Sequence, residues 1–346
     1  MQKATGDPAE KSPVLGRDAP QKVGRQQAGS YVGPNPKVRL VNRGRGPGSR
    51  RLLVPIRQEL DAKTRWPAAA LGSCPPSSHP CQANVHAMAE GDTIHRIARR
   101  LSAALAGRRV LDATVPSPRS PLRGQTARLV GLRGGRLTRA EARGKHLLLH
   151  FDGDLALHCH LGMRGAWQVR QPRSKWRRPI GGAWVVLATE GAEGAQFGGT
   201  RLALRSEGEL RADPRLASLG PDLLDPEFVP SAHLAPLRAR SGDRSLGESL
   251  LDQSVVSGVG NVYKSEGCFV AGVDPWRAVS ELDDTEIGLV LETLRKLMLQ
   301  GLEGGRRPRQ VYRRAGLPCI RCGAPVRSHG QGDANRTTYW CGNCQR

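Results

Sequence analysis

The pattern of apolar positions along the chain changes near residue 88. From there, apolar side chains recur at intervals of three and four residues, which is the spacing of one buried face of an α-helix. These residues are Ile94, Ile97, Ala98, Leu101 and Leu105, and Gly107 follows as a stop signal. We therefore predict an amphipathic helix that opens at the stretch MAEGD, residues 88–92.

Residues 110–205 carry a different pattern. Short runs that are apolar, or that alternate between apolar and polar residues, are separated by glycine-containing turns, which is typical of β-strands. Examples are HLLLHF at 146–151, DLALHCH at 154–160 and AWVVLA at 183–188. We predict an antiparallel β domain with the architecture of a sandwich, which together with the first helix forms residues 88–215.

Helical periodicity returns between residues 216 and 301. SLGESLLDQSVV is followed by the glycine-broken turn SGVGN, by VYKSEGCFVAG and by the long amphipathic segment DDTEIGLVLETLRKLMLQG. We assign residues 216–305 to a helical domain and residues 306–346 to a small module that is too short for a hydrophobic core of its own. The predicted fold class is a multidomain α+β protein.

Residues 1–87 show no sustained period. They contain 11 of the chain's 25 prolines and an excess of Lys and Arg over Asp and Glu. This composition predicts a segment that is either disordered or not translated. The sequence shows no signal peptide and no apolar run long enough to span a membrane, so we expect a soluble, cytoplasmic protein.

The formal net charge of +22 indicates a polyanionic partner, since clustered Lys and Arg release counterions from a phosphate backbone. Nucleic acid is the first candidate. An arginine-rich composition without such a partner is the alternative that charge alone leaves open.

Four of the eight cysteines form two C-x-x-C pairs near the C-terminus. The spacing C-x2-C-x18-C-x2-C is that of a tetrahedral four-thiolate zinc site, and four thiolates leave no open position for catalysis. Between the pairs, the strand NRTTYW carries Arg336 either on a rigid hairpin with a function or as a solvated surface residue. We predict one structural Zn2+ bound by Cys319, Cys322, Cys341 and Cys344.

Three further stretches bear candidate chemistry. SGVGNVYKSE, 257–266, is a tight turn that enters a helix, where backbone N–H groups and an Asn amide can bind a phosphate, although most such turns only solve a steric problem. RGKHLLLHF places Lys145 between a glycine and a strand. HLGMRG, 160–165, presents Met163 and Arg164, and an exposed Met in such a turn can fill the gap that an extruded nucleotide leaves, whereas a buried one belongs to the core.

In their order along the chain, these motifs resemble the formamidopyrimidine-DNA glycosylase and endonuclease VIII family. MAEGD, RGKHLLLHF, HLGMRG, LGPDLLDP, LLDQSVVSGVGNVYKSE and the terminal cysteine pairs carry the resemblance, which covers residues 88–346. The MAEGDT opening and the LGMRG turn look most like the actinobacterial endonuclease VIII branch. The resemblance implies an N-terminal helix with a β-sandwich, a helix–two-turns–helix domain and a zinc finger, with DNA in the cleft between the halves.

The resemblance also implies catalytic residues. Family members begin, once the initiator Met is removed, with Pro and Glu, and the free α-amine attacks C1′ of the damaged nucleotide. About a tenth of an α-amine is neutral at pH 7, roughly two orders of magnitude more than of a lysine. Ala89 occupies the position of that Pro, and Glu90 that of a carboxylate that moves protons, although a helix start also favours a Glu electrostatically. Lys145 matches the lysine that binds the lesion's phosphates and assists proton transfer.

The DNA-binding residues follow in the same way. Asn261 and Arg336 match residues that bind the phosphate backbone at the lesion. Met163 with Arg164 match the loop that fills the gap in the base stack. The nearby Glu266 is expected to give structural support.

The chain departs from the family pattern at two points. Ala89 in place of Pro keeps a primary amine that can form an iminium but loses the constrained secondary amine. The Arg-and-Phe loop of the formamidopyrimidine branch has no clear counterpart, although FGGTR at 197–201 lies in that region. This favours the endonuclease VIII side, and with it oxidised pyrimidines and abasic sites as substrates.

The resulting hypothesis is a bifunctional DNA glycosylase and β,δ-lyase of base excision repair, a nucleoid-associated monomer that acts on damaged double-stranded DNA. It requires a free amine on Ala89, because an amide nitrogen cannot attack. We therefore predict translation from Met88, without residues 1–87. The alternative is a catalytically silent binder of damaged or bent DNA that retains the extension. A zinc-finger transcription regulator would explain the finger and the charge, but neither the helix at MAEGD nor Lys145.

Overall fold

The computed structural model describes residues 89–304 and 309–346. The predicted extension, residues 1–87, and Met88 lie outside the described residues. Within these two ranges, no helix is both long enough and apolar enough to cross a bilayer.

The helix predicted at MAEGD is present as α1, Gly91–Leu105, and its apolar stripe is its buried face. Ile94, Leu101 and Leu105 are each at most 1% exposed. Glu90 precedes the helix in an extended conformation, so that the chain enters α1 directly from this residue. The helix contacts strands of both sheets described next.

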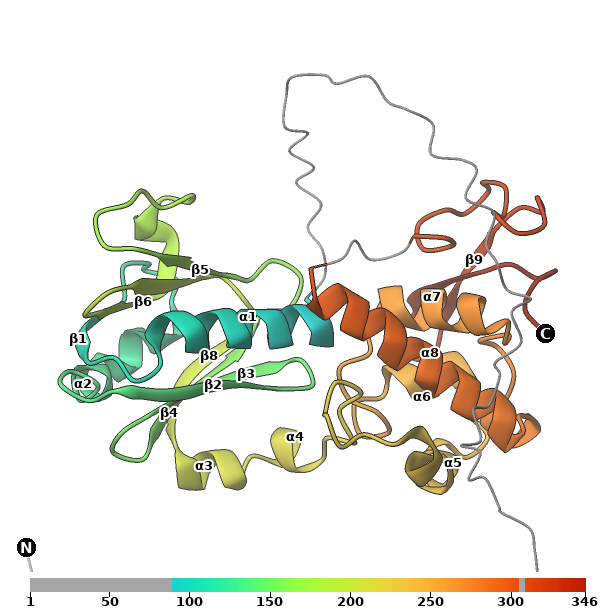
Figure 1. Cartoon of the computed structure of the whole chain (residues 1–346), viewed down its shortest axis with the longest axis horizontal. Helices are drawn as coiled ribbons and strands as arrows, with labels where there is room; N and C mark the ends of the chain where they lie inside the picture. Colours follow the sequence, from blue (N-terminus) through green and yellow to red (C-terminus); the bar gives the residue numbers. More distant parts are fainter. Residues whose placement is uncertain (1–88, 305–308) are drawn as a thin grey trace, which may run out of the picture. The chain divides into compact units, whose positions relative to one another are not determined.

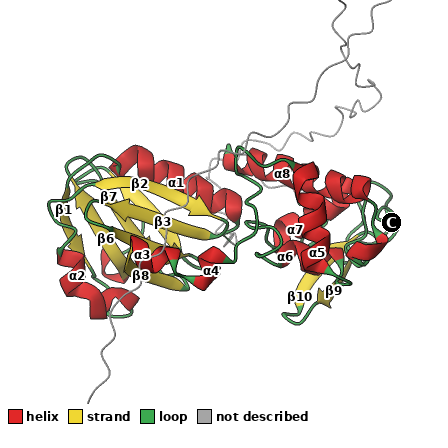
Figure 2. Ribbon diagram, turned by 90° about the horizontal axis from the view of Figure 1, so that it is seen from below, coloured by secondary structure: helices red, strands yellow, loops and turns green. Residues whose placement is uncertain are grey.

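Two four-stranded antiparallel sheets confirm the predicted sandwich (Figure 2). Their strand orders are β1-β6-β7-β5 and β2-β3-β4-β8. The first sheet comprises β1 Val110–Thr114, β5 Ala166–Arg170, β6 Ala183–Thr189 and β7 Glu193–Phe197. The second comprises β2 Leu137–Arg143, β3 His146–Phe151, β4 Leu155–His160 and β8 Arg201–Ser206. The connections contain η1 Pro121–Gln125, α2 Thr126–Val130 and η2 Ile180–Gly182.

The pairing of β3 with β4 matters for the position of the site. His146 at the start of β3 lies opposite His160 at the end of β4. Lys145 immediately precedes the first residue, and the turn with Met163 immediately follows the second. The register therefore brings two of the predicted functional motifs to the same end of the sheet.

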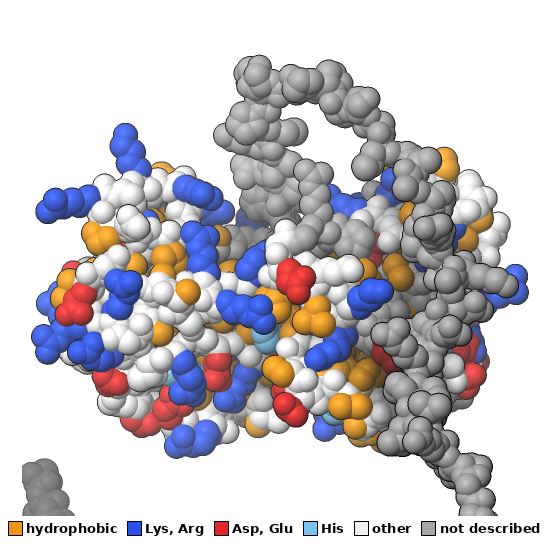
Figure 3. Space-filling model, viewed as in Figure 1, with side chains coloured by type: hydrophobic (Ala, Val, Ile, Leu, Met, Phe, Trp, Pro, Cys, Tyr) orange, Lys and Arg blue, Asp and Glu red, His pale blue; other side chains and the backbone are white. Residues whose placement is uncertain are grey.

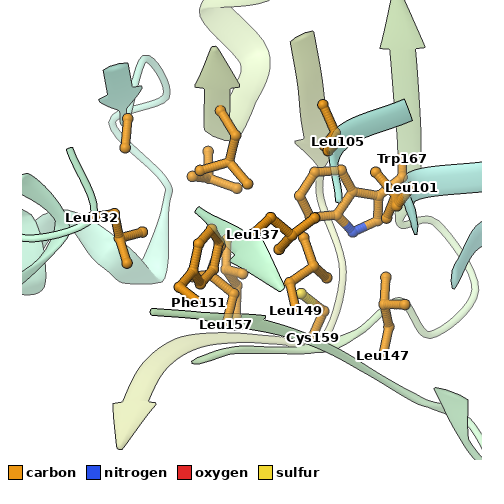
Figure 4. Packing of buried hydrophobic residues seen from close by; sticks show 14 of the residues in the cluster. Leu101, Leu105, Leu132, Leu137, Leu147, Leu149, Phe151, Leu157, Cys159 and Trp167 are labelled. Atoms are coloured by element: carbon orange, nitrogen blue, oxygen red, sulfur yellow. The ribbon is translucent and has the colours of Figure 1, made fainter. Parts of the chain in front are cut away.

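Leucine side chains fill the space between the sheets and α1 (Figure 4). Leu147, Leu149 and Leu157 from β3 and β4 are fully buried, and they share this core with Phe151 and Trp167. Because β3 and β4 supply so many of these side chains, the end of the sheet that carries Lys145 is anchored in the core.

Helices follow β8 as predicted. They are α3 Glu207–Arg211, α4 Pro214–Ala217, η3 Pro230–His233, α5 Leu234–Ser241, α6 Leu246–Leu251, α7 Asn261–Ala271, η4 Val279–Glu281 and α8 Asp284–Leu302. A capping box between Asp283 and Glu286 begins α8. The helices α7 and α8 pack against each other (Figure 1). Residues 261–269 of α7 are all buried, so this helix is enclosed on every side.

The C-terminal module contains a single hairpin among its described residues, formed by β9 Arg327–Gln331 and β10 Arg336–Trp340. Arg336 pairs with Gln331 next to the turn of the hairpin. Strand β10 also packs against α7. The module therefore holds Arg336 close to the start of that helix.

We predict that Leu101→Ala lowers the free energy of unfolding by about 2–5 kcal/mol, because it leaves a cavity between α1 and the sandwich. Leu111→Ala is the matched control, since Leu111 is 54% exposed, and it should change stability by less than about 0.5 kcal/mol. Urea denaturation followed by tryptophan fluorescence measures both changes. Equal effects would contradict the assignment of this helix face to the core.

Candidate active site

A cavity of about 520 Å3 gathers residues that are distant in sequence. All three predicted catalytic residues, Ala89, Glu90 and Lys145, line it. Three of the four predicted DNA-binding residues line it as well, namely Met163, Asn261 and Arg336. Arg164 is exposed beside Met163 and does not line the cavity.

The carboxylate of Glu90 is bound by the first turn of α7. Its Oε1 accepts a hydrogen bond from the backbone N–H of Val262 at 3.0 Å, and its Oε2 accepts one from that of Tyr263 at 3.3 Å. Glu90 is 1% exposed. Two amide dipoles and the positive end of the helix thus compensate the buried charge.

Gly260 makes this contact possible. A Cβ at this position would lie 2.4 Å from Cδ of Glu90, which is far inside van der Waals contact. A similar close approach joins the start of α1 to the same turn, where the N–H of Gly91 donates to the carbonyl of Gly258 at 2.9 Å. The glycines of SGVGN therefore allow two backbones and one carboxylate to meet.

Two of the helix-start amides of SGVGNVYKSE, for which a phosphate was the predicted partner, are used within the protein. The N–H groups of Val262 and Tyr263 donate to Glu90, so they are not directed to an external anion. The side chain of Asn261 is also engaged, because its Nδ2 donates to the carbonyl oxygen of Thr337 at 2.7 Å. Its Oδ1 is buried and has no hydrogen-bond partner among the described residues.

Lys145 follows a glycine whose geometry is fixed. Gly144 has a φ of +56°, and a Cβ there would lie 2.9 Å from Cβ of Ser257. The N–H of Gly144 donates to Oδ2 of Asp222 at 2.8 Å, and the same oxygen lies 2.9 Å from Nε2 of His95 in α1. Asp222, in the segment assigned to the helical domain, therefore binds both the turn before Lys145 and α1 of the sandwich domain, a role that the motif LGPDLLDP did not reveal.

Burial lowers the pKa of Lys145 to about 8. The nearby Glu90 opposes this shift, because a negative charge stabilises the ammonium, whereas the positive charge of Arg336 adds to it. A large fraction of the Lys145 side chains therefore loses the ammonium proton at a pH only slightly above 7.

His160 is a cavity residue that sequence reasoning missed. It is the first residue of HLGMRG and lines the cavity with Lys145. Burial, with the charge of Lys145, lowers its pKa, so the ring is neutral at pH 7. Its Nδ1 lies 2.7 Å from Oγ1 of Thr200. The signal in the sequence is its place as the first residue of HLGMRG, three positions before Met163.

Met163 is 59% exposed, which excludes the core assignment for this side chain. Its turn is closed by a hydrogen bond from the N–H of Gly165 to the carbonyl of Leu161 at 2.9 Å. An apolar side chain is thus held at the edge of a polar cavity.

Glu266 makes structural contacts, as expected. Its carboxylate accepts hydrogen bonds from the backbone N–H groups of Gln310, Val311 and Tyr312 at 2.7–3.1 Å. These bonds join residues 310–312, near the start of the C-terminal module, to α7.

The side chains of the four clustered cysteines lie close together in space. Their Sγ atoms all lie within 4.8 Å of one another. Cys319 and Cys344 approach to 3.8 Å, and Cys322 and Cys341 to 3.5 Å. A tetrahedron with Zn–S bonds of about 2.3 Å has edges of about 3.8 Å, so this thiolate cage fits zinc.

Figure 3 shows Lys and Arg side chains spread over the visible face, with acidic side chains between them. This distribution agrees with the net charge of +22 and with a polyanionic partner.

Two family models match consecutive parts of the chain. The model of the formamidopyrimidine-DNA glycosylase N-terminal domain matches residues 88–215, and that of the formamidopyrimidine-DNA glycosylase H2TH domain matches residues 219–311. Together they cover every residue that lines the cavity except those between 331 and 336 in the C-terminal hairpin.

Comparisons with individual proteins indicate the same family. A Streptomyces coelicolor protein with the name Probable endonuclease 8 2 is 42% identical over 276 residues, covering 75% of this chain and 94% of that protein. A DNA-(apurinic or apyrimidinic site) lyase of Mycolicibacterium smegmatis is 35% identical over 270 residues, covering 75% and 99%. A Lactococcus lactis formamidopyrimidine-DNA glycosylase, solved with abasic-site DNA, has the same fold, with a TM-score of 0.64 at 22% identity and coverage of 74% and 99%. The chain belongs to the formamidopyrimidine-DNA glycosylase and endonuclease VIII family of DNA repair enzymes, and it resembles the actinobacterial endonuclease VIII branch.

Proposed function

We propose that this protein is a bifunctional glycosylase and lyase of base excision repair that removes oxidised bases, chiefly pyrimidines, from double-stranded DNA. The observation that carries the proposal is the joint position of Ala89, Glu90 and Lys145 on one cavity. The names of the Streptomyces and Mycolicibacterium relatives, an endonuclease 8 and an abasic-site lyase, support the same chemistry. The enzyme works as a cytoplasmic, nucleoid-associated monomer.

The proposed nucleophile is the free α-amine of Ala89, in a protein translated from Met88 and trimmed by one residue. The neutral amine attacks C1′ of the damaged nucleotide, the base leaves, and an iminium forms. The iminium acidifies C2′, so β- and then δ-elimination cleave the strand. A primary amine suffices for these steps, although an N-terminal Pro would be more constrained.

Glu90 is the proposed proton carrier next to that amine. Its two hydrogen bonds from α7 fix the position of the carboxylate. An ionised carboxylate can take the proton that the attacking amine releases and return it to the sugar oxygen as the ring opens.

The DNA contacts divide by chemistry. Lys145 and Arg336 supply cations for the phosphates that flank the lesion, and the second N–H of the Asn261 side-chain amide supplies a hydrogen-bond donor, since the first donates to Thr337. Met163 and Arg164 occupy the gap in the base stack when the damaged nucleotide turns out of the duplex. The exposure of Met163 supports this role, because an apolar side chain in water gains by insertion between bases.

Zinc has a structural role in the proposal. Bound by Cys319, Cys322, Cys341 and Cys344, it would stabilise the fold of the small module that carries Arg336. A catalytically silent DNA binder remains the second candidate, because the nitrogen of Ala89 is part of a peptide bond in the chain of 346 residues.

We predict that a protein that starts at Ala89 is trapped covalently by borohydride on a duplex with an abasic site, and that the adduct maps to Ala89. Glu90→Gln should slow strand cleavage at least about 100-fold, because it removes the proton carrier. Glu292→Gln is the control, since Glu292 is exposed on α8. No adduct from the Ala89-started protein would leave only the silent binder.

Gly260→Ala should slow cleavage of an abasic-site duplex at least tenfold, because the added Cβ displaces the carboxylate of Glu90. Gly288→Ala in α8 is the matched control, because a Cβ there meets no atom within 4 Å. That change should leave the rate unaltered and stabilise the helix by about 0.5–1 kcal/mol. A rate for Gly260→Ala within twofold of the parent would show that the position of Glu90 is unimportant.

Cys341→Ser should abolish zinc binding, measured as metal per chain by mass spectrometry, and weaken binding to abasic-site DNA, because three thiolates hold zinc poorly. Cys268→Ala is the control, since the thiol of Cys268 lies outside the cluster. Retention of zinc and of DNA affinity by Cys341→Ser would disprove the structural role of the metal.

A further inference from the structure

We propose that Lys145 is a second amine nucleophile, which forms the Schiff base with abasic sites when the residues before Ala89 remain attached. The inference rests on the proposed function, because it uses the same cavity. It gives the full-length chain a lyase activity that does not depend on a free α-amine.

Position singles out Lys145 among the lysines of the described ranges. It is the one that lines the cavity, together with Glu90 and the residues proposed to hold the lesion's phosphates. Lys264 lies in the motif SGVGNVYKSE, but it is fully buried, and its Nζ donates to Oγ1 of Thr338 at 2.5 Å. A sugar cannot reach that nitrogen. Lys175 is exposed and does not line the cavity.

The turn before β3 directs Lys145 reproducibly. The positive φ of Gly144, its hydrogen bond to Asp222 and its contact with Ser257 define the path of the backbone. Strand β3 then enters the hydrophobic core at Leu147. The side chain is therefore presented from a fixed point, as a nucleophile requires.

The electrostatic surroundings favour the neutral amine. Burial and Arg336 lower the pKa of Lys145 to about 8, against the opposing effect of Glu90. About a tenth of the side chain is then neutral at pH 7, roughly two orders of magnitude more than of an ordinary lysine. His160 faces Lys145 as a neutral ring. The other charged side chains that line the cavity are Arg244, Glu248, Asp252 and Asp333.

The reaction balances without an oxidant or a reductant. Neutral Nζ of Lys145 adds to the C1′ aldehyde of an abasic site, and the carbinolamine loses water to give an iminium. Loss of a proton from C2′ to the carboxylate of Glu90 expels the 3′ phosphate. Water then hydrolyses the iminium and returns the amine.

The experiment compares the full-length chain with the Ala89-started protein, each incubated with an abasic-site duplex and borohydride and mapped by peptide mass spectrometry. The full-length chain, verified by intact mass, should carry the adduct on Lys145, and the Ala89-started protein on Ala89. Lys145→Arg in the full-length chain should reduce trapping at least tenfold at protein concentrations that saturate the duplex, as measured by fluorescence anisotropy, because a guanidinium stays protonated and forms no iminium. Lys175→Arg, the matched control, should leave trapping unchanged.

Trapping by the full-length chain should increase about fivefold between pH 7 and pH 8 and level off above about pH 9, as the neutral fraction of a group with a pKa of about 8 increases. An adduct on any other lysine, or on Ala89 of a trimmed chain, overturns the inference. So does a full-length chain that binds the duplex without an adduct while the Ala89-started protein is trapped. Failure of both proteins overturns the proposed function as well.

Discussion

The hydrogen bonds between the Glu90 carboxylate and the first turn of α7 are the contact on which the rest of the site depends. They join a residue that precedes the first helix of the sandwich half to a helix of the other half, across 172 and 173 positions of sequence. A buried carboxylate is costly unless dipoles compensate it, so the two halves must meet closely at this point. The glycines at 91, 258 and 260 serve that close approach.

Helix α7 also holds the C-terminal module in place beside the cavity. Its first residue, Asn261, binds the backbone of Thr337 in the C-terminal hairpin, and Glu266 binds the chain that leads to the module. The C-terminal hairpin and the carboxylate of Glu90 are therefore both held by the same helix. Asp222, in the segment assigned to the helical domain, fixes the turn before Lys145 by accepting a hydrogen bond from the backbone N–H of Gly144.

Much of this could be predicted from sequence because the signals are local. The apolar stripe of α1, the strand HLLLHF and the cysteine spacing are each visible within one short window, and the structure shows the helix, the strand and the cysteine cluster. The order of the motifs then indicated the family, which the comparisons confirm. The assignments of individual residues to catalysis remain predictions.

Long-range pairings left no such signal. The need for a glycine at position 260 follows only from the carboxylate of Glu90, 170 positions earlier. The role of Asp222 follows only from the backbone amide of Gly144, 78 positions earlier. The helix-start amides looked available for a phosphate because the partner that uses them lies in another half of the chain. A short stretch of sequence shows which polar groups need a hydrogen-bond partner, but it does not show which distant residue supplies that partner.

The complete burial of residues 261–269 in α7 has a consequence for how such an enzyme can change over generations. Nearly every substitution on this helix disturbs packing on some side, so its sequence has little freedom. Met163 and Arg164, by contrast, are exposed in a turn that carries little of the core. Substitutions can therefore accumulate in that turn at little cost to folding, while the packing of α7 beside the cavity stays unchanged.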